Sequence, residues 1–237
     1  MHITSSALLV LTVMAPCWAT RCTGQEDYVE ERRSMVRDQL EARDIVDRTV
    51  LEAMGAVRRH EFVPAMLETS AYRDHPLPIG NQQTISQPYI VALMTQLAEV
   101  SADDIVLEVG TGSGYQAAVL AEIVNQVYTI EIIAELATSA RERLTSLGYE
   151  NVNVRAGDGY LGWEEKAPFD AILVTAAATE VPPPLVEQLK PGGIMIIPVG
   201  PRSQVQSLRR IQKTEDNSTT NEEVIPVLFV PLTREIR

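Results

Sequence analysis

The feature that most constrains the fold is the alternation of strand-like and helix-like segments from Ile105 towards the end of the chain. Strands are expected at residues 105–109, 126–130, 152–154, 169–175 and 194–197, and helices at 116–124, 133–148 and 184–189. Strands that alternate with helices form a parallel sheet that is covered on both faces. The sequence therefore predicts an α/β protein with a doubly wound, mostly parallel sheet.

The segments on either side of this pattern add a helical, loop-rich part before the sheet and a strand pair after it. Residues 26–54 place apolar side chains at helical spacing and predict one or two helices, and another helix is expected at 91–100. Four prolines between residues 60 and 90 indicate irregular chain. Residues 204–212 and 224–230 suggest an antiparallel β pair, with residues 213–223 as its surface loop and Pro191, Gly192 and Gly193 as a preceding turn.

The composition is that of one globular unit. The chain has 237 residues, of which 45% are apolar, enough to bury a core of ordinary size. We expect residues 25–237 to form a single domain, with 25–100 as its helical, loop-rich part and 101–237 as its sheet. The net charge is −12, whereas nucleic-acid binders normally show a basic surface. No apolar run reaches the about 18 residues of a membrane helix, so neither nucleic acid nor stable membrane association is expected.

The first 24 residues differ from the rest of the chain. They contain no Asp or Glu, and an apolar run at residues 7–15 is followed by Pro16 and by small residues around Ala19. This pattern resembles a secretory signal, although no Lys or Arg precedes the run. Two interpretations stay open: an export signal, or a true start at Met35 or a nearby codon. Both cysteines, Cys17 and Cys22, lie here, so the globular part has no thiol for a disulfide, a zinc site or a nucleophile.

A glycine-rich turn follows the first expected strand of the sheet, with the sequence E-V-G-T-G-S-G-Y at residues 108–115. Glycines in such a turn let backbone amides approach a ligand closely. The dinucleotide fingerprint G-x-G-x-x-G fails because Tyr115 stands in place of the third glycine. Glu108 precedes the first glycine by two residues, which suits a cationic ligand better than a pyrophosphate. S-adenosyl-L-methionine has an ammonium and a sulfonium and no phosphate, so we predict it as the cofactor, with a purely structural turn as the alternative.

Two more acidic residues lie where the next two strands are expected to end. Glu131 ends the second strand, 17 residues after Gly114, and an acid at about this distance accepts hydrogen bonds from ribose hydroxyls. Asp158 lies between two glycines after the third strand, where its carboxylate can accept from an adenine amino group. Three acids at the carboxyl ends of successive strands indicate one crevice. The candidate cofactor-binding residues of this region are Glu108, Gly110, Thr111, Gly112, Gly114, Glu131, Asp158 and Gly159. No metal site is expected.

The sequence does not favour a nucleic-acid base as the acceptor of the methyl group. The fourth strand ends without the Asn/Asp-Pro-Pro-aromatic motif of enzymes that methylate exocyclic amines. The other concentrated polar feature is the segment from Gly80 to Pro88, which carries hydroxyl and amide groups but no charge. From its chemistry alone it could be a functional loop, or a surface turn with a serine that caps the next helix.

Six motifs, in order along the chain, resemble those of the protein-L-isoaspartate O-methyltransferase family. They are T-I-S-Q-P at residues 84–88, V-L-E-V-G-T-G-S-G-Y at 106–115, G-D-G at 157–159, F-D-A-I at 169–172 with A-A-A at 176–178, L-K-P-G-G at 189–193 and V-P-L-T at 230–233. The resemblance runs from about residue 33 to 233. It implies a Rossmann-like fold of the class I methyltransferase type, with an N-terminal helical extension and a C-terminal antiparallel β pair.

The resemblance implies a protein repair enzyme. Such an enzyme transfers the methyl group of S-adenosyl-L-methionine to the free carboxylate of L-isoaspartyl residues in damaged proteins and peptides, and the ester collapses through a succinimide towards normal aspartate. By position, Ser86 matches the active-site serine, and Thr84, Ile85, Gln87 and Pro88 complete the substrate loop. Glu108, Gly110, Glu131, Asp158 and Gly159 match cofactor contacts, and Thr233 matches a threonine near the cofactor. Gln82 departs from the pattern, because many bacterial members have glycine there.

Members of the family are generally cytosolic, so we expect a cytoplasmic monomer, with the periplasm as the alternative if the first 24 residues are an export signal. Two other functions stay open: a methyltransferase for a small carboxylic acid, and a cofactor-binding module without catalysis. The chemistry of ester formation needs few side chains. A carboxylate acceptor has a pKa near ~4 and is ionised at neutral pH, so no general base is required. Alignment of the reacting groups can supply roughly 7–11 kcal/mol.

Overall fold

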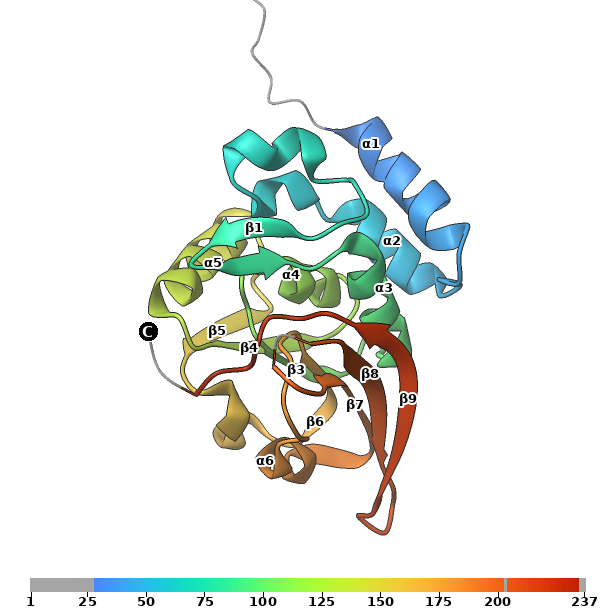
Figure 1. The fold of residues 1–237 in the computed structure, drawn as a ribbon, viewed down its shortest axis with the longest axis vertical. Helices are drawn as coiled ribbons and strands as arrows, with labels where there is room; N and C mark the ends of the chain where they lie inside the picture. Colours follow the sequence, from blue (N-terminus) through green and yellow to red (C-terminus); the bar gives the residue numbers. More distant parts are fainter. Residues whose placement is uncertain (1–27, 203, 235–237) are drawn as a thin grey trace, which may run out of the picture.

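The computed structural model describes residues 28–202 and 204–234 (Figure 1). Within them, seven strands form one sheet in the order β5-β4-β3-β6-β7-β8-β9, and two more strands form a separate hairpin, β1-β2. The strands are β1 (Leu77–Gly80), β2 (Gln83–Ile85), β3 (Ile105–Val109), β4 (Gln126–Glu131), β5 (Val152–Ala156), β6 (Phe169–Val174), β7 (Leu189–Val199), β8 (Gln206–Lys213) and β9 (Thr219–Val227).

Helices connect the parallel strands and precede the sheet. The α-helices are α1 (Val29–Ser34), α2 (Arg48–Ala56), α3 (Pro88–Leu97), α4 (Tyr115–Ala121), α5 (Ala134–Ser146) and α6 (Pro183–Glu187). Helix α1 continues into a π-helical segment, Met35–Glu41. Short 3₁₀ helices lie at Arg59–Phe62, Ala65–Ser70, Gly159–Leu161 and Glu164–Lys166.

The sheet is parallel from β5 to β7, and β8 and β9 add to it in antiparallel orientation. Of the seven strands in this sheet, β3 is the first along the chain, and it lies between β4 and β6, so the strand order reverses there. Open parallel sheets bind ligands at this reversal point, beyond the carboxyl ends of the strands. The expected α/β fold with a mostly parallel sheet and a C-terminal antiparallel pair is confirmed.

The core has two layers because successive side chains of a strand point to opposite faces of the sheet. On β3, Val106 joins a cluster with residues of α2, α3 and α4 on one face. Its neighbour Leu107 joins a second cluster on the other face, which includes Leu185 of α6 and Met195 of β7. Both faces of the sheet are therefore covered, as the doubly wound arrangement requires.

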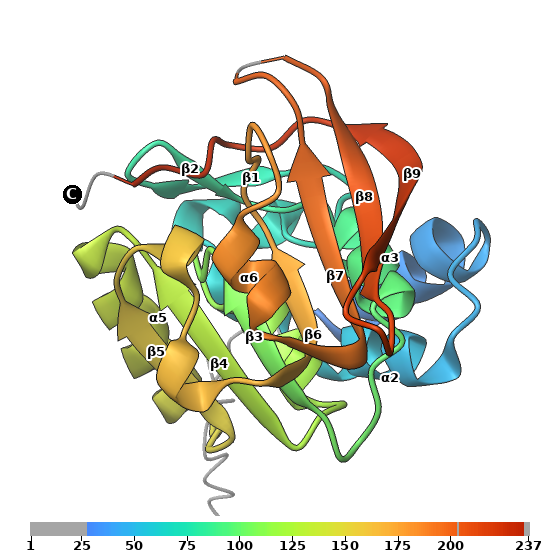
Figure 2. The same cartoon turned by 90° about the horizontal axis from the view of Figure 1, so that it is seen from below.

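The N-terminal part packs onto the same core and extends over one end of the sheet. Met35, Leu40, Ile45 and Met54 are fully buried in the cluster that also contains Val106. The β1–β2 hairpin lies beyond the end of the sheet to which the arrows of β6 and β7 point (Figure 2). The hairpin therefore overhangs the carboxyl ends of the parallel strands, where a ligand is expected.

Three sequence-based expectations about local structure are wrong. Residues 77–85 form the β1–β2 hairpin instead of irregular chain, with the two-residue turn Asn81-Gln82 at positive φ, as tight hairpin turns require. The expected turn at residues 191–193 lies inside β7. These residues belong to an irregularity in which β7 has more residues than the facing part of β6, so the register shifts. Most of the expected loop at 213–223 is strand, because β9 begins at Thr219. The first five residues of this edge strand are exposed, so polar side chains can occupy them.

The expected export signal at residues 1–24 lies outside the described residues. Among the described helices, none combines the length and apolar character needed to cross a bilayer.

Candidate active site

A cavity lies at the carboxyl ends of β3 and β4. Four stretches of chain form most of its walls: residues 83–86 around the end of β2, residues 108–113 around the end of β3, residues 130–133 around the end of β4, and residues 230–233 near the end of the described chain. Ten of the predicted site residues line this cavity. They are Thr84, Ile85, Ser86, Glu108, Gly110, Thr111, Gly112, Glu131, Gly159 and Thr233.

Glu108 places a carboxyl group at the cavity wall without exposure to solvent. It is the fourth residue of β3 and is 0% exposed. Its Oε2 accepts a hydrogen bond of 2.5 Å from the Thr129 hydroxyl of the neighbouring strand, whereas Oε1 is buried and has no hydrogen-bond partner within the described chain. Burial raises the pKa of Glu108 to about 8. An unpartnered buried oxygen on a cavity wall is suited to a hydrogen-bonding cation.

Glu131 fixes the glycine turn from the end of the next strand. Its Oε2 accepts from the backbone amide of Gly112 at 2.8 Å, and its Oε1 accepts from that of Ile133 at 3.0 Å. Each carboxylate oxygen can accept a second hydrogen bond. The side chain therefore orients the turn and still has acceptor capacity towards the cavity.

Gly110 and Thr175 hold the start of the turn in close contact. The Thr175 hydroxyl, which follows β6, donates to the carbonyl oxygen of Gly110 at 2.7 Å. Gly110 has a φ of +104°, and a Cβ atom at this position would lie 2.5 Å from Thr175 Oγ1. Only glycine fits here, because an L side chain meets both an unfavourable φ and a hydroxyl that is already engaged.

Asp158 lies beside the cavity and does not line it. Its Oδ1 accepts from the Tyr160 amide at 2.9 Å, and its Oδ2 accepts from Arg234 Nε at 3.1 Å. The Arg234 guanidinium also lies over the Tyr160 ring. This ion pair ties the C-terminal segment to the loop that follows β5. Gly114 is likewise absent from the cavity wall and packs instead against Leu144 of α5.

Residues 84–88, here called the 84–88 loop, connect the hairpin to α3. Ser86 is half-buried, and within the described chain its hydroxyl forms no hydrogen bond. The alternative of a capping serine is wrong, since Gln87 occupies the N-cap position of α3 and makes no side-chain cap. Ser86 is thus available to a ligand. Gln87 and Pro88 do not line the first cavity.

A second cavity adjoins the first on the outer side of the 84–88 loop. The two share Thr84, Ser86, Thr175 and Val230. Mostly apolar side chains form the rest of its wall, and none is charged: they are Pro76, Gln87, Ile90, Pro226, Val227, Leu228 and Phe229. The Ser86 side chain therefore lies between an inner chamber with carboxylates and an outer, uncharged groove.

Sequence reasoning missed several residues of these walls. Thr175 lines both cavities, and its place at the carboxyl end of β6 is the signal that could have identified it. Tyr115 and the Val230–Leu232 backbone also line the inner cavity. Residues 230–232 belong to the V-P-L-T motif, of which only Thr233 is a predicted site residue, and they reach the cavity through a bridge to Ala177.

The described histidines are not placed for catalysis. His60 is buried outside the cavity and hydrogen bonded to the Tyr72 hydroxyl at 2.7 Å, and burial lowers the pKa of its ring. His75 also lies outside both cavities. Among the described residues, no group of three or more His, Cys, Asp or Glu side chains is arranged to hold a metal ion.

Comparison with known proteins supports the resemblance. A family model described as protein-L-isoaspartate(D-aspartate) O-methyltransferase matches residues 30–237. Protein-L-isoaspartate O-methyltransferase 1 of Nitrosospira multiformis is 58% identical over 208 residues, which are 87% of this chain and 88% of that protein. Protein-L-isoaspartate O-methyltransferase 2 of a Polaromonas species is 57% identical and covers 86% of this chain and 98% of that protein.

A solved structure has a similar fold over most of this chain. It is a Plasmodium falciparum protein named as a beta-aspartate methyltransferase (PCMT) and is in complex with S-adenosyl-L-homocysteine. It is 28% identical, with a TM-score of 0.74, over 86% of this chain and 99% of that one. On the family match and these relatives, the chain belongs to the protein-L-isoaspartate(D-aspartate) O-methyltransferase family.

Proposed function

We propose that this chain methylates the free carboxylate of L-isoaspartyl residues in damaged proteins and peptides, with S-adenosyl-L-methionine as donor. Membership of the family supports the activity. The observation that carries the proposal is that Ser86, with a free hydroxyl, and Glu108, with an unpartnered buried oxygen, line the same cavity. The first side chain suits a carboxylate and the second suits a cation.

The residues of the inner cavity fit the cofactor. Its ammonium group matches Glu108, whose Oε1 needs a donor, and its ribose hydroxyls match Glu131 at the end of β4. The turn residues Gly110, Thr111, Gly112 and Gly114, together with Asp158, Gly159 and Thr233, are the other residues we assign to its binding. When bound, the cofactor supplies a methyl group on a sulfonium, which is a strong leaving group.

The chain's own residues then have to bind and orient the acceptor. We assign Ser86 to donate a hydrogen bond to the substrate carboxylate, with Thr84, Ile85, Gln87 and Pro88 shaping the loop around it. No side chain has to remove a proton, because the carboxylate is already ionised at neutral pH. Alignment of the oxygen with the methyl carbon, and partial exclusion of water, supply the rate enhancement.

The outer groove gives the protein substrate a place to lie. It is uncharged and mostly apolar, it adjoins Ser86, and the side chain of Leu228 at its rim is exposed. Peptide residues on either side of the isoaspartate lie along this groove while the carboxylate reaches the inner cavity. A small carboxylic acid would leave the groove unused, which favours a peptide substrate over that alternative.

The test is a methanol-release assay with two peptides that differ only in an isoaspartyl or a normal aspartyl residue. Methyl ester is expected with the isoaspartyl peptide alone. Equal activity on both peptides, or on a small acid in preference to either, would replace the proposal with a different methyltransferase. Binding of S-adenosyl-L-homocysteine without turnover on any carboxylate would indicate a non-catalytic module.

The same proposal extends to the organisation of the protein. Residues 25–237 form one methyltransferase domain that acts as a monomer on protein substrates, without nucleic acid or stable membrane association. The cytoplasm is the proposed compartment, because the donor and the substrates of the family are found there, and the periplasm is the alternative. Light scattering tests the monomer, and fractionation with N-terminal sequencing of the native protein tests the compartment.

A further inference from the structure

The connection that carries Ser86 is short and has few contacts of its own. Only Ser86 and Gln87 separate the end of β2 from the start of α3. Pro88 has no amide hydrogen to donate, and Gln87, at the N-cap position, gives the helix no side-chain cap. Local backbone structure therefore leaves the position of this serine weakly determined. Two charged side chains from an earlier part of the chain supply the missing contacts.

Arg59 contacts the connection from the interior. Its Nη2 donates to the Ser86 carbonyl oxygen at 2.8 Å and its Nε donates to that of Ala71 at 2.7 Å. The guanidinium is 0% exposed and lies 4.7 Å from the centre of the Tyr115 ring, at the start of α4. Within the described chain no carboxylate forms an ion pair with it.

A buried cation with no ion-pair partner is costly for stability. A residue that served only to fill this space could be apolar. Arg59 instead joins the serine of the 84–88 loop to Tyr115, which lines the inner cavity. Its planar fork of donors holds two carbonyl groups from two different nitrogens, a geometry that the compact ammonium of a lysine does not reproduce.

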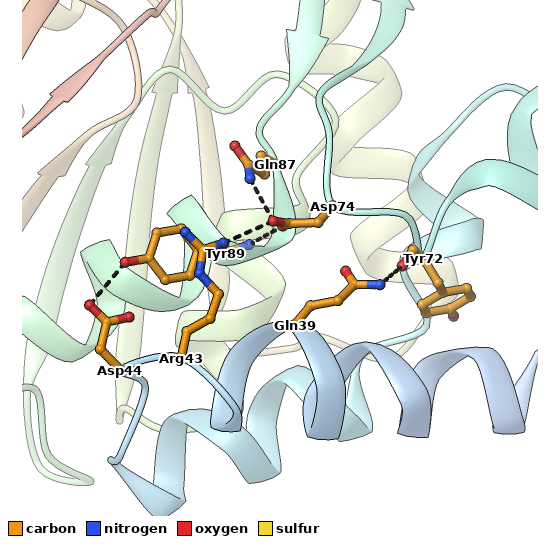
Figure 3. A network of polar contacts seen from close by, with 7 residues as sticks. All are labelled: Gln39, Arg43, Asp44, Tyr72, Asp74, Gln87 and Tyr89. Atoms are coloured by element: carbon orange, nitrogen blue, oxygen red, sulfur yellow. Dashed lines mark hydrogen bonds and ion pairs between the residues drawn. The ribbon is translucent and has the colours of Figure 1, made fainter.

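Asp74 contacts the same connection from the outer side (Figure 3). Its Oδ2 accepts from Gln87 Nε2 at 2.7 Å, and its Oδ1 accepts from the Tyr89 amide at 3.1 Å. Asp74 therefore provides the cap that Gln87 does not, with a negative charge at the positive end of α3. Arg43 pairs with Asp74 at 3.0 Å and stacks on the Tyr89 ring, so the carboxylate itself is held in place.

We propose that Arg59 and Asp74 are positioning residues for methyl transfer, which together fix the Ser86 hydroxyl relative to the cofactor-binding turn by anchoring Ser86, Gln87 and Tyr89 from two sides. This inference rests on the proposed function of Ser86. Neither residue touches the substrate in this role, and neither lines the inner cavity. Their effect on the reaction passes through the geometry of the 84–88 loop. A displacement of about 1 Å of a reacting group can reduce the rate about 100-fold.

The first experiment compares Asp74→Asn with the matched control Asp38→Asn. The amide keeps the shape of Asp74 and an acceptor for the Tyr89 amide, but it turns a donor towards Gln87 or Arg43. Asp38 forms an exposed ion pair with Arg37 and contacts no part of the 84–88 loop. For Asp74→Asn we expect kcat/KM on an isoaspartyl peptide to fall about tenfold or more. The Kd for S-adenosyl-L-homocysteine, measured by calorimetry, stays at the wild-type value. Asp38→Asn changes neither quantity.

A double-mutant cycle separates positioning from a general loss of stability. If Asp74 acts through Gln87, the double variant Asp74→Asn/Gln87→Ala loses little more activity than Gln87→Ala alone. Independent, multiplying losses would contradict that route. Assays run well below the melting temperature of each variant, which is measured by circular dichroism, so that unfolding does not enter the comparison.

Arg59→Lys tests the inner anchor without removing the buried charge. We expect kcat/KM for the peptide to fall much more than the cofactor affinity, because a lysine lacks the two separate nitrogens that reach the Ser86 and Ala71 carbonyls. The proposal is overturned if Asp74→Asn and Arg59→Lys both retain wild-type kcat/KM, or if peptide and cofactor parameters fall together. Failure of the proposed function is a separate result, since the wild-type chain would then leave the isoaspartyl peptide unmethylated.

Discussion

The turn that follows β3 and the 84–88 loop face the same cavity, yet they are held by different kinds of contact. The turn is fixed by groups at the ends of the neighbouring strands: the Gly110 amide donates to the Ile130 carbonyl at 2.8 Å, and the Gly112 amide donates to the Glu131 carboxylate at 2.8 Å. The loop is fixed by charged side chains that come from 13 and 27 residues earlier in the chain. Sheet register therefore sets one wall of the cavity, and long-range side-chain contacts set the other.

This difference predicts which changes each wall tolerates. Adding a side-chain atom to a tightly packed glycine of the turn should abolish cofactor binding, because the turn backbone is hydrogen bonded to the neighbouring strand and has no room to move. Changes to the loop should impair methyl transfer and leave the cofactor bound. The following predictions test or refine this division, beginning with the largest effect.

Gly110→Ala should raise the Kd for S-adenosyl-L-homocysteine about 100-fold or more, because the added Cβ would lie 2.5 Å from Thr175 Oγ1 and displace the turn. Calorimetry measures this directly. The matched control is Gly148→Ala, which has a similar positive φ but no atom within 4 Å of the new Cβ. It should lose stability and keep cofactor affinity. Equal affinities in the two variants would show that the turn does not bind the cofactor.

Ser86→Ala should lower kcat on an isoaspartyl peptide by about 10- to 100-fold, the usual effect of losing one hydrogen bond to a charged group. Cofactor affinity should not change, because the described contacts of the glycine turn do not include Ser86. A methanol-release assay and calorimetry on the same preparation give both values. A variant with wild-type turnover would remove Ser86 from the mechanism.

Glu108, near the end of β3, adds a fully buried ionisable group to the wall formed by the glycine turn. Burial raises its pKa from 4.5 to about 8, so the folded protein without ligand holds a proton that the unfolded chain releases within this range. Its contribution to the free energy of unfolding therefore decreases as pH rises from about 4.5 to 8, by up to about 1.4 kcal/mol per pH unit. Urea titrations at several pH values measure the slope. Glu108→Gln should flatten it, and an unchanged slope would assign it to another group.

Gln82→Gly should have the smallest effect, within about 1 kcal/mol. Gln82 has a φ of +59° in the hairpin turn, where glycine avoids steric strain but loses more backbone entropy on folding. Thermal unfolding should show a small change in melting temperature, with kcat/KM unaltered. A large loss of activity would mean that the Gln82 side chain contributes to the substrate site.

The sheet and the cofactor wall were predictable because local sequence carries their signal. Residues 105–109 form β3 as expected, and the three acids lie at neighbouring strand ends. The parallel register that aligns these ends follows from the alternation of strands and helices. Glycine spacing identified the turn for the same reason, since its constraint is on the backbone itself.

The other wall carried a weaker local signal. Two strands of four and three residues, with prolines at 76 and 78, are too short to give a periodic pattern. The T-I-S-Q-P motif identified Ser86 only through the family. Nothing near Ser86 in sequence predicts its contact with Arg59, which depends on the packing of the N-terminal part. Similarly, Asp158 was expected to face the cofactor, and its ion pair with Arg234 arises from chain 76 residues away.

Because burial raises the pKa of Glu108 to about 8, we expect its carboxyl group to hold a proton at neutral pH while no ligand lies against it. A cationic group that binds at the unpartnered Oε1 would favour the carboxylate form, so we expect ligand uptake to be coupled to release of this proton and ligand release to its return. The affinity of the cavity for a cationic ligand should therefore rise with pH through this range.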